Sequence, residues 1–472
     1  MSRVKVVATI GPRTADRKSI RALIDAGMDV ARLNGSHANF DWHSNMIDLI
    51  RLVSPNTPIL IDLPGSKVRT ALLTHEPVLA IGDRVVFTTE PGHDGNGKIS
   101  LNNERVHEQL SPGDKISADD GMLRFEVEEV FGRDIICRSR TAGQLGSRKG
   151  INLGAVAIPS NSDGRDREMI EFAKKKGVDF IGVSFVDSVA KIHAVREVIG
   201  GPTPFVLSKI ENMGGMDNVE ALAMESDALM IDRGDLSAET NLESIALFQK
   251  RILNVARDVG KPVVVATEML HSMIRSAQPT KAEVTDISNA VLDGAAALML
   301  SGETAIGDFP IQTVSMMRRI ADTVSESQQN ALDEAGGTSV SEAMADAVAL
   351  ICRQVPITKI VAITISGYAA RRLAAARLRQ PILAVSNDPL TARSLNLLFG
   401  TEGVFLDVPF LKTSTDHIVT CLEHLWRMGK LVGEDLVLVN SVAYPRSGNR
   451  MNIIQTHGIE DLRCSQGWQD AT

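Results

Sequence analysis

Eight short apolar runs recur along the chain, and each ends at or close to polar or charged residues. Nearly continuous hydrophobic runs that alternate with helical stretches are typical of parallel strands buried on both faces of a sheet. Eight of them predict an α/β fold with a closed (β/α)8 TIM barrel, whose active site lies at the carboxyl ends of the strands. The runs are Val4–Ile10, Val30–Leu33, Ile59–Asp62, Phe180–Phe185, Phe205–Ile210, Ala228–Ile231, Val263–Thr267 and Ala297–Leu300.

The residues at the ends of these runs are of types that chemistry can use. If the runs close into a barrel, these side chains meet at one rim, where we expect a ring of charges and hydroxyls. They are Arg13, Arg32, Asn34, Asp62, Ser184, Lys209, Glu211, Asp235, Thr267, Ser301 and Glu303.

Residues 71–154 interrupt the barrel pattern with short β-like runs and no long helical pattern. Turn pairs such as Pro91-Gly92 and Pro112-Gly113 separate the runs, which is typical of a small all-β domain. We predict a small β-barrel lid domain inserted in the catalytic barrel, which would comprise residues 1–70 and 155–332. The predicted lid strands are Arg84–Thr89, Lys98–Leu101, Leu123–Val130 and Asp134–Arg140.

The last part of the chain has a third pattern. Gly336-Gly337-Thr338 indicates a linker, and helical stretches alternate with apolar runs after it. We predict a separate open α/β domain over residues 338–472. Its strands are expected at Ile360–Ile365, Ile382–Val385, Val404–Leu406 and Leu436–Asn440.

The composition excludes several classes of partner. A net charge of −8 over 472 residues argues against nucleic acid and anionic membranes and confines positive sites to local patches. No apolar run approaches the roughly 20 residues of a membrane span, and the early first strand leaves no room for a signal peptide. The four cysteines are scattered without metal-binding spacing, which suits reduced thiols. We therefore expect a cytoplasmic protein.

Lys209 and Glu211 lie two residues apart at the end of one strand, so their side chains point to the same side. Asp235 follows the next strand, and the two carboxylates would repel each other unless a cation lay between them. Such a pair suits Mg²⁺, which keeps water and completes its shell with substrate oxygens. Salt bridges to Lys209 or Arg233 explain the same carboxylates equally well, and the pattern alone leaves both interpretations open.

Arg32, Arg69 and Lys209 would bring positive charge to the same rim, as a phosphorylated substrate requires. The amides of Gly234 and Asp235 are expected in a loop before a helix, where they could hold a carboxylate.

Thr267, Ser301 and Glu303 end or follow the last two strands. Hydroxyls near a carboxylate can relay a proton, or they can simply cap backbone groups. Taken singly, each of these residues fits capping better, and only their joint placement at one rim favours a catalytic role.

Eight motifs connect these residues: Ala8–Pro12, Arg32–His37, Asp62–Arg69, Arg148–Leu153, Ser208–Asn212, Arg233–Leu236, Ala266–Leu270 and Met299–Ala305. Each is short and weak by itself, but so many in this order are highly specific. Over essentially the whole chain they resemble the pyruvate kinase family. The resemblance implies transfer of the phosphoryl group of phosphoenolpyruvate to ADP, giving pyruvate and ATP, with Mg²⁺ as cofactor and Mn²⁺ as a possible substitute.

The resemblance also implies roles for the rim residues. Lys209 and Arg32 would neutralise charge on the transferred group and on the enolate, and Glu211 and Asp235 would hold Mg²⁺. The substrate carboxylate would bind Gly234, Asp235 and Thr267, and Thr267 would help to protonate the enolate with support from Ser301 and Glu303. The nucleotide phosphates would lie against Asn34, Gly35, Ser36, His37, Arg69 and Lys149, under a closing lid. The family usually forms a homotetramer.

One departure from the family pattern concerns the monovalent cation. Many members need K⁺ and have a hydroxyl and a glutamate after the third strand, whereas this chain has Leu63 and Lys67 there. The Lys67 ammonium could supply the positive charge that K⁺ otherwise brings, so we expect K⁺-independent activity. A solvated loop lysine is the alternative. The residues of this monovalent-cation region are Asn34, Ser36, Asp62, Leu63 and Lys67.

Other departures leave the reactive residues intact. Glu268 replaces the usual Gln, Gly35 stands where Phe is common, Lys281 replaces an Arg, and residues 157–163 differ from the usual segment after the lid. The resemblance implies a regulatory role for the C-terminal domain, where Thr364, Ser366, Gly367 and Tyr368 resemble a loop that grips a sugar-phosphate effector. Because Tyr368 removes a small hydroxyl and Tyr444–Gly448 is a faint match to the companion loop, we expect no response to fructose bisphosphate or a different phosphorylated effector.

Two rival functions remain at this stage. A 2-oxo-acid lyase or aldolase on the same barrel would also use Mg²⁺ beside an enolate, but it has no nucleotide to hold. The second rival is a metabolite sensor that binds its ligand through the C-terminal domain and catalyses only weakly. The departures at Glu268 and at residues 157–163 leave that possibility open.

Overall fold

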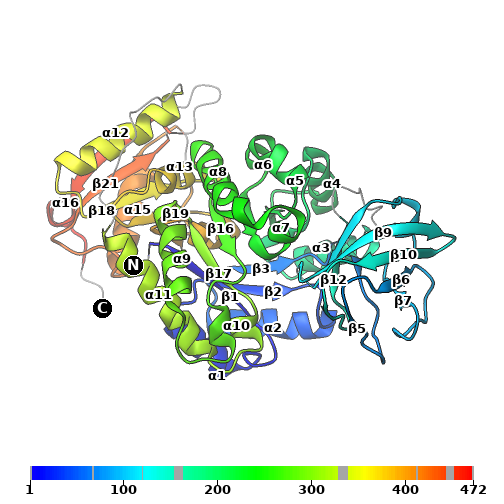
Figure 1. Ribbon diagram of the computed structural model, residues 1–472. Helices are drawn as coiled ribbons and strands as arrows, with labels where there is room; N and C mark the ends of the chain where they lie inside the picture. The colour runs from blue at the N-terminus through cyan, green and yellow to red at the C-terminus, as the bar shows by residue number, and fades with distance from the viewer. Residues whose placement is uncertain are drawn as a thin grey trace.

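The computed structural model describes residues 3–65, 68–119, 121–153, 163–327, 339–410, 413–442 and 451–469. A central barrel lies between a β-rich unit and a C-terminal α/β unit (Figure 1). The predicted (β/α)8 barrel and the separate α/β domain are therefore confirmed.

Eight parallel strands close the barrel in the order β1-β17-β16-β15-β14-β13-β3-β2. Each predicted apolar run supplies one of them, because both faces of every strand are buried. The strands are β1 (Lys5–Thr9), β2 (Val30–Asn34), β3 (Ile59–Asp62), β13 (Phe180–Val183), β14 (Phe205–Ile210), β15 (Ala228–Asp232), β16 (Val263–Ala266) and β17 (Ala297–Leu300).

Helices surround the barrel and begin where the sequence offers caps. Asp16 accepts hydrogen bonds from the amides of Lys18 and Ser19, which starts the first helix as predicted. The helices are α1 (Arg17–Asp25), α2 (Phe40–Val53), α3 (Asp163–Lys175), α4 (Val189–Ile199), α5 (Met213–Asp217), α6 (Val219–Glu225), α7 (Arg233–Glu239), η2 (Leu242–Ser244), α8 (Ile245–Asp258), η3 (His271–Ile274), α9 (Lys281–Leu292), α10 (Gly302–Ala305) and α11 (Pro310–Ser327).

The barrel is a packed core on both sides of its sheet. Inward side chains such as Val7, Leu60 and Met230 fill its interior, and a larger cluster packs the outer face of the strands against the helices. Burying apolar surface is the main favourable term in folding, so this double layer holds the strand ends, and the residues on them, in fixed places.

The inserted unit is β-rich, with a short 3-10 helix, and has its own buried cluster around the edge-to-face pair Phe87 and Phe125. Its first strand starts at Val68, before residue 71, where we expected the lid to begin. A seven-stranded sheet (β4-β12-β8-β9-β10-β6-β7) and a two-stranded sheet (β11-β5) make up the unit. The elements are β4 (Val68–Arg69), β5 (Val78–Leu79), β6 (Arg84–Thr88), β7 (Ile99–Ser100), η1 (Val106–Glu108), β8 (Lys115–Ala118), β9 (Leu123–Phe131), β10 (Asp134–Ser139), β11 (Gly143–Gln144) and β12 (Gly150–Asn152).

The C-terminal unit is an open sheet in the order β20-β19-β18-β21-β22, parallel except for β22 at one edge. Buried clusters cover both faces of the sheet. Its elements are α12 (Val340–Gln354), β18 (Lys359–Ile363), α13 (Tyr368–Ala375), β19 (Ile382–Ser386), α14 (Pro389–Ser394), η4 (Leu395–Leu397), β20 (Thr401–Phe405), α15 (Asp416–Arg427), β21 (Leu436–Ser441), β22 (Ile453–Gly458) and α16 (Ile459–Gln466).

This unit docks on the barrel floor, by which we mean the amino ends of the barrel strands. The Gly400 amide donates to the Arg3 carbonyl at 2.7 Å, and Lys5 Nζ donates to the Thr401 carbonyl at 2.8 Å. Arg393 reaches Asp179 Oδ1 at 2.8 Å. The opposite end of the barrel, the rim, faces the β-rich unit (Figure 1).

Among the described residues, no helix is long and apolar enough to cross a membrane. The four cysteines are free thiols, and three of them are buried.

Candidate active site

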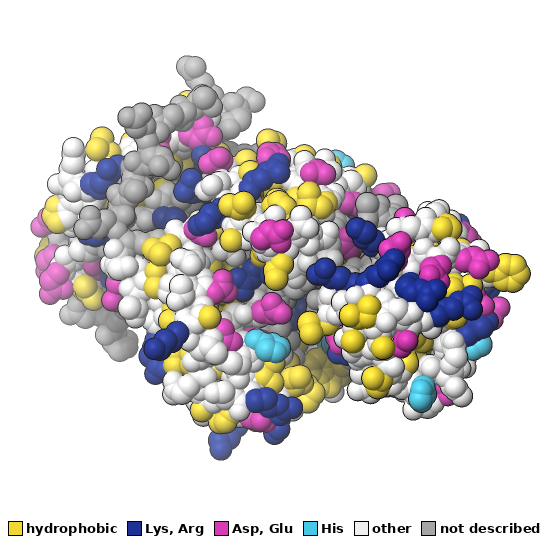
Figure 2. Space-filling model, viewed as in Figure 1, with side chains coloured by type: hydrophobic (Ala, Val, Ile, Leu, Met, Phe, Trp, Pro, Cys, Tyr) yellow, Lys and Arg dark blue, Asp and Glu magenta, His cyan; other side chains and the backbone are white. Residues whose placement is uncertain are grey.

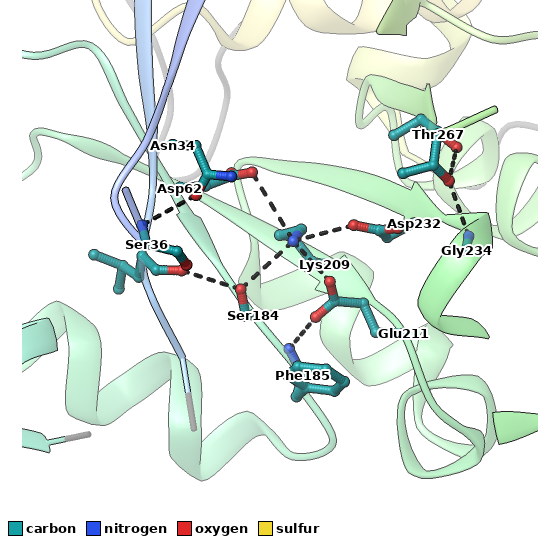
Figure 3. A network of polar contacts seen from close by, with 12 residues as sticks. Asn34, Ser36, Asp62, Ser184, Phe185, Lys209, Glu211, Asp232, Gly234 and Thr267 are labelled. Carbon is teal, nitrogen blue, oxygen red and sulfur yellow. Dashed lines mark hydrogen bonds and ion pairs between the residues drawn. The ribbon is translucent and has the colours of Figure 1, made fainter. Parts of the chain in front are cut away.

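The strand register brings the predicted residues together at the rim. Asp62 on β3 lies opposite Asn34 on β2 and Gly182 on β13, and Lys209 lies opposite Met230 on β15. Lys209 is the centre of the resulting network (Figure 3).

Three carboxylates surround the Lys209 ammonium, which is buried. Its Nζ lies 2.7 Å from Glu211 Oε1, 3.2 Å from Asp232 Oδ2 and 3.9 Å from Asp62 Oδ2. Ser184 Oγ lies at 3.5 Å. The salt-bridge interpretation of Glu211 is thus correct, and it does not exclude a bound metal ion, because the two cations Lys209 and Arg32 face three carboxylates.

Burial acts on both members of the closest pair. It would lower the pKa of Lys209, but Glu211, Asp62 and Asp232 raise that pKa well above its usual value. Burial raises the pKa of Glu211 to about 8; Lys209 opposes this shift, and Asp232 and Asp235 add to it. The site therefore carries crowded negative charge, which favours the binding of a positive ion.

Arg32 is held by Asp62. Its Nε donates to Asp62 Oδ2 at 2.7 Å, and Nη1 donates to Thr9 Oγ1 at 2.9 Å. The other oxygen, Asp62 Oδ1, has no hydrogen-bond partner among the described residues. A Cβ on Gly182 would lie 2.0 Å from that oxygen, so only glycine fits there.

Three carboxylates could share a metal ion. Glu211, Asp232 and Asp235 each offer an oxygen, and these oxygens lie within 4.8 Å of one another. We predicted Glu211 and Asp235 and gave Asp232 no role. Its position could have revealed it, because in a strand Asp232 points to the same side as Met230, two residues earlier.

The Gly234 amide already has a partner in this structure. It donates to Thr267 Oγ1 at 2.9 Å, and Thr267 Oγ1 donates to the Ala266 carbonyl at 2.6 Å. The expected loop at Gly234 and Asp235 is the first turn of α7, which starts at Arg233 directly after β15.

Glu303 binds backbone amides that follow two neighbouring barrel strands, one of them the amide of Ser301. Glu303 Oε2 accepts the Ser301 amide at 2.8 Å, and Oε1 accepts the Leu270 amide at 3.3 Å. Both carboxylate oxygens thus serve as caps that tie β17 to the segment after β16. Ser301 Oγ is buried and has no hydrogen-bond partner among the described residues, so its hydrogen-bonding capacity is unused.

Comparison with known proteins agrees with this geometry. The family model described as "Pyruvate kinase, barrel domain" matches residues 1–314, and "Pyruvate kinase, alpha/beta domain" matches residues 342–456. The chain belongs to the pyruvate kinase family. The enzyme named pyruvate kinase from Mycobacterium tuberculosis (strain H37Rv) is 36% identical, with 97% of this chain and 98% of the relative covered. That from Borreliella burgdorferi is 34% identical over 93% of each chain.

A solved structure gives the same result. The crystal structure of a pyruvate kinase from Cryptosporidium parvum superposes with a TM-score of 0.86 and 30% identity, covering 97% of this chain and 96% of that one. The resemblance stated from the motifs is therefore confirmed.

The nucleotide segment predicted from the pyruvate kinase family follows β2 as a tight turn. Asn34 Oδ1 accepts the Ser36 amide at 3.0 Å. A Cβ on Gly35 would lie 2.4 Å from the Asp62 carbonyl, which explains why this chain has no bulky residue there. Partial burial lowers the pKa of His37, and so do the charges of Arg69, Arg32, Arg148 and Arg165. Four arginines thus lie near this turn.

The lid contributes the remaining predicted cations. Arg69 Nη1 donates to the Arg148 carbonyl at 3.3 Å, and Lys149 Nζ pairs with Asp119 at 2.7 Å. Lys and Arg side chains gather on the lid near its junction with the barrel (Figure 2). There a cleft of about 890 Å³ separates the lid from the segment between α7 and α8, and its lining includes Arg124 and Glu239.

The monovalent-cation region is described only in part. Leu63 is buried, and its carbonyl accepts Ser184 Oγ at 3.2 Å. Lys67 lies outside the described residues, as do 154–162, which include most of the departing segment after the lid. Glu268 is exposed, so its charge faces solvent.

The candidate effector loop is closed by an arginine. The Ser366 carbonyl accepts Arg371 Nη2 at 2.6 Å, and Gly367 has a φ of 76°. Thr364 is buried, and its amide donates to the Val385 carbonyl at 2.9 Å. Tyr368 starts α13. The expected companion loop, Tyr444–Gly448, lies outside the described residues.

Proposed function

We propose that this protein transfers the phosphoryl group of phosphoenolpyruvate to ADP, giving pyruvate and ATP. The observation that carries the proposal is the buried Lys209 ammonium, set among Glu211, Asp232 and Asp62 with Arg32 beside it. A fixed pair of cations next to a crowded acidic site is what a phosphoryl transfer between anions needs. Membership of the pyruvate kinase family supports the same reaction.

The acidic site fits a divalent cation. Carboxylate oxygens are the hard ligands that Mg²⁺ and Mn²⁺ prefer, and the Glu211, Asp232 and Asp235 oxygens are close enough to share one ion. We propose Glu211 and Asp235 as its ligands, as predicted, with Asp232 as a third. When bound, the ion would neutralise phosphate and carboxylate oxygens of the substrate.

The surrounding side chains would do the remaining work. Lys209 and Arg32 would neutralise the phosphoryl group and the enolate oxygen, because both are held in place by carboxylates before substrate binds. Thr267 would lie near the substrate carboxylate and help to deliver the proton, with Ser301 beside it. Glu303 would act through the backbone amides that it holds.

The nucleotide phosphates would bind between the barrel and the lid. Asn34, Gly35, Ser36 and His37 form the turn on the barrel side, and Arg69 and Lys149 come from the lid. The positive charge near His37 supports an anion site here. Lid closure would then exclude water from the transfer.

Three finer features remain proposals. We propose K⁺-independent activity, based on Leu63 and on the charge of Lys67, whose position lies outside the described residues. At Thr364, Ser366, Gly367 and Tyr368 we propose either no response to fructose bisphosphate or a different phosphorylated effector, because Tyr368 removes a small hydroxyl from the loop. We also propose that the protein assembles as a homotetramer and is located in the cytoplasm.

The first experiment is the initial rate of pyruvate formation from phosphoenolpyruvate, ADP and Mg²⁺, in potassium buffer and in potassium-free buffer. We expect about 1–100 turnovers per second, the usual range of kinases, in both buffers. A rate only with K⁺ would keep the function and remove the proposed role of Lys67. No turnover in either buffer would overturn the proposed function.

A further inference from the structure

Arg233 links three separate elements beside the candidate site. As the first residue of α7, it reaches across to the segment that follows β16. Its Nη2 donates to the Thr267 carbonyl at 2.9 Å and to Met269 Sδ at 2.9 Å. Its Nη1 lies 2.8 Å from both carboxylate oxygens of Asp286 on α9. Both terminal nitrogens are thus engaged inside the protein.

The segment that Arg233 contacts has an unfavourable backbone. Thr267 has a φ of 67° and Glu268 a φ of 54°, so two successive residues with side chains occupy the left-handed region. For a β-branched residue such as Thr267 this conformation is a genuine outlier. Such strain costs about 1–3 kcal/mol per residue and persists only where the surroundings enforce it. Arg233 contacts this turn at the Thr267 carbonyl.

The turn determines where the Thr267 hydroxyl lies. Thr267 Oγ1 accepts the Gly234 amide and donates to the Ala266 carbonyl. Gly234 follows Arg233 in the chain, so α7 holds Thr267 from two sides, by its carbonyl and by its hydroxyl. An ordinary β conformation at Thr267 would move the hydroxyl away from the rim.

Asp286 is itself well anchored. It belongs to α9, which starts with a capping box between Thr280 and Glu283. Glu283 also accepts the Ser272 amide at 2.7 Å, which fixes this helix against η3. Nη1 contacts both oxygens of Asp286 while Nη2 contacts the Thr267 carbonyl, so Asp286 holds one side of the guanidinium and sets the orientation of Arg233.

We propose that Arg233 and Asp286 are positioning residues for Thr267. Asp286 orients Arg233, Arg233 holds the strained Thr267–Glu268 turn, and the turn places the Thr267 hydroxyl toward the reacting carbon. This inference rests on the proposed function. It assigns Arg233 to the protein framework, although its charge and place in the sequence would also suit a phosphate ligand.

Asp286→Asn tests the proposal, because it removes the charge of the anchor and leaves Arg233 and its shape. A displacement of about 1 Å can cost on the order of 100-fold in rate, so we expect kcat to fall about that much while the KM for phosphoenolpyruvate changes less than threefold. Asp293→Asn is the matched control. Asp293 caps the carboxyl end of α9, the helix that carries Asp286, and pairs with Lys250 on α8. It lies away from the Thr267–Glu268 turn.

A double-mutant comparison separates positioning from general damage. If Asp286 acts through Thr267, then Asp286→Asn has no further effect on kcat in a Thr267→Ala background. Equal losses in both backgrounds would overturn the proposal, and so would an unchanged kcat in Asp286→Asn. Arg233→Lys should behave as Asp286→Asn does, since a lysine keeps the charge but lacks the two separate nitrogens that contact Asp286 and the Thr267 carbonyl.

A second readout does not depend on turnover. In protein with ¹³C-labelled threonine methyl groups, the Thr267 signal is identified by its loss in Thr267→Ala. Asp286→Asn should shift or broaden this signal, whereas Asp293→Asn should leave it in place. An unmoved signal in Asp286→Asn would refute the inference. Failure of the wild-type chain to form pyruvate would instead refute the proposed function. The methyl signal would then still test whether Asp286 and Arg233 position Thr267.

Discussion

Both ends of the barrel bury charged and polar side chains, but the two ends differ in whether these groups have hydrogen-bond partners. On the floor, Asp179 is fully buried and both of its oxygens are used. Oδ1 accepts Arg393 at 2.8 Å, and Oδ2 accepts Arg51 at 2.5 Å and the Ile59 amide at 2.8 Å. At the rim, Asp62 Oδ1 and Ser301 Oγ are also buried, yet among the described residues nothing hydrogen-bonds to them.

This difference indicates what each end is for. Buried polar groups in native proteins nearly always have partners, and an unpaired one calls for an explanation. On the floor, both oxygens of Asp179 are satisfied within the chain, because the C-terminal unit supplies Arg393 and the barrel supplies Arg51. The rim leaves part of its polar capacity to a ligand, and its negative charge exceeds its positive charge around Lys209. Substitutions on the floor should therefore cost stability, and those at the rim should cost function.

The largest effect is expected for Lys209→Met. The substitution removes the central cation, so we expect turnover to fall by about 10³- to 10⁵-fold, the range for losing a charge-stabilising cation in phosphoryl transfer. The fold should persist, because Glu211, whose pKa is already raised to about 8, can take up a proton. Steady-state rates and circular dichroism measure the two outcomes.

Lys250→Met is the control for Lys209→Met, since its ammonium pairs with Asp293 away from the rim. It should leave turnover within about twofold. Near-normal turnover in Lys209→Met would remove that residue from the proposed chemistry.

The next largest effect is expected on the floor, for Asp179→Ala. The substitution leaves Arg51 and Arg393 without their shared carboxylate, and breaking a buried ion pair typically costs about 3–5 kcal/mol. Urea unfolding followed by tryptophan fluorescence reports on both units, because Trp42 lies in the barrel and Trp426 in the C-terminal unit. The KM for phosphoenolpyruvate should not change.

Asp48→Asn provides the surface comparison, since Asp48 is 65% exposed in its pair with Lys176. Exposed pairs contribute only about 0–1 kcal/mol. If Asp179→Ala were no more damaging than Asp48→Asn, the floor would not be a tightly paired interface.

A third prediction concerns Asp232 and a divalent ion without substrate. Even groups that only orient metal ligands cost about 10- to 100-fold in affinity when removed, and Asp232 lies within reach of a shared ion. We expect Asp232→Asn to weaken Mn²⁺ binding by at least that factor, measured by electron paramagnetic resonance. Asp217→Asn, an exposed acid on α5, should leave the affinity unchanged. Equal affinities in both variants would restrict Asp232 to the role of counter-ion for Lys209.

The fold was more predictable than the site, for a physical reason. Each barrel strand is apolar on both faces, so a single run of residues identifies it. Gly182 could not be assigned in the same way, because its importance depends on which strand is its neighbour. The Thr267–Glu268 turn was invisible for another reason: its left-handed backbone is enforced by Arg233 and Asp286, which are distant in sequence. In the lid, the short strand β8 had no long apolar run to reveal it.

The smallest predicted effect is at Lys5, on the floor. Burial lowers the pKa of Lys5, against the opposing charge of Asp29. Since the folded pKa lies below the unfolded one, the unfolded chain binds more protons between these two values, and stability due to Lys5 rises with pH across that window. At pH 7, Lys5→Met should change the free energy of unfolding by only about 1 kcal/mol, because losing the hydrogen bond to Thr401 opposes the relief of burying an ammonium. As the pH approaches 10, the free energy of unfolding of the wild-type chain should rise relative to that of Lys5→Met. Urea midpoints at both pH values, with exposed Lys175→Met as control, measure this. A difference independent of pH would mean that folding does not change the pKa of Lys5.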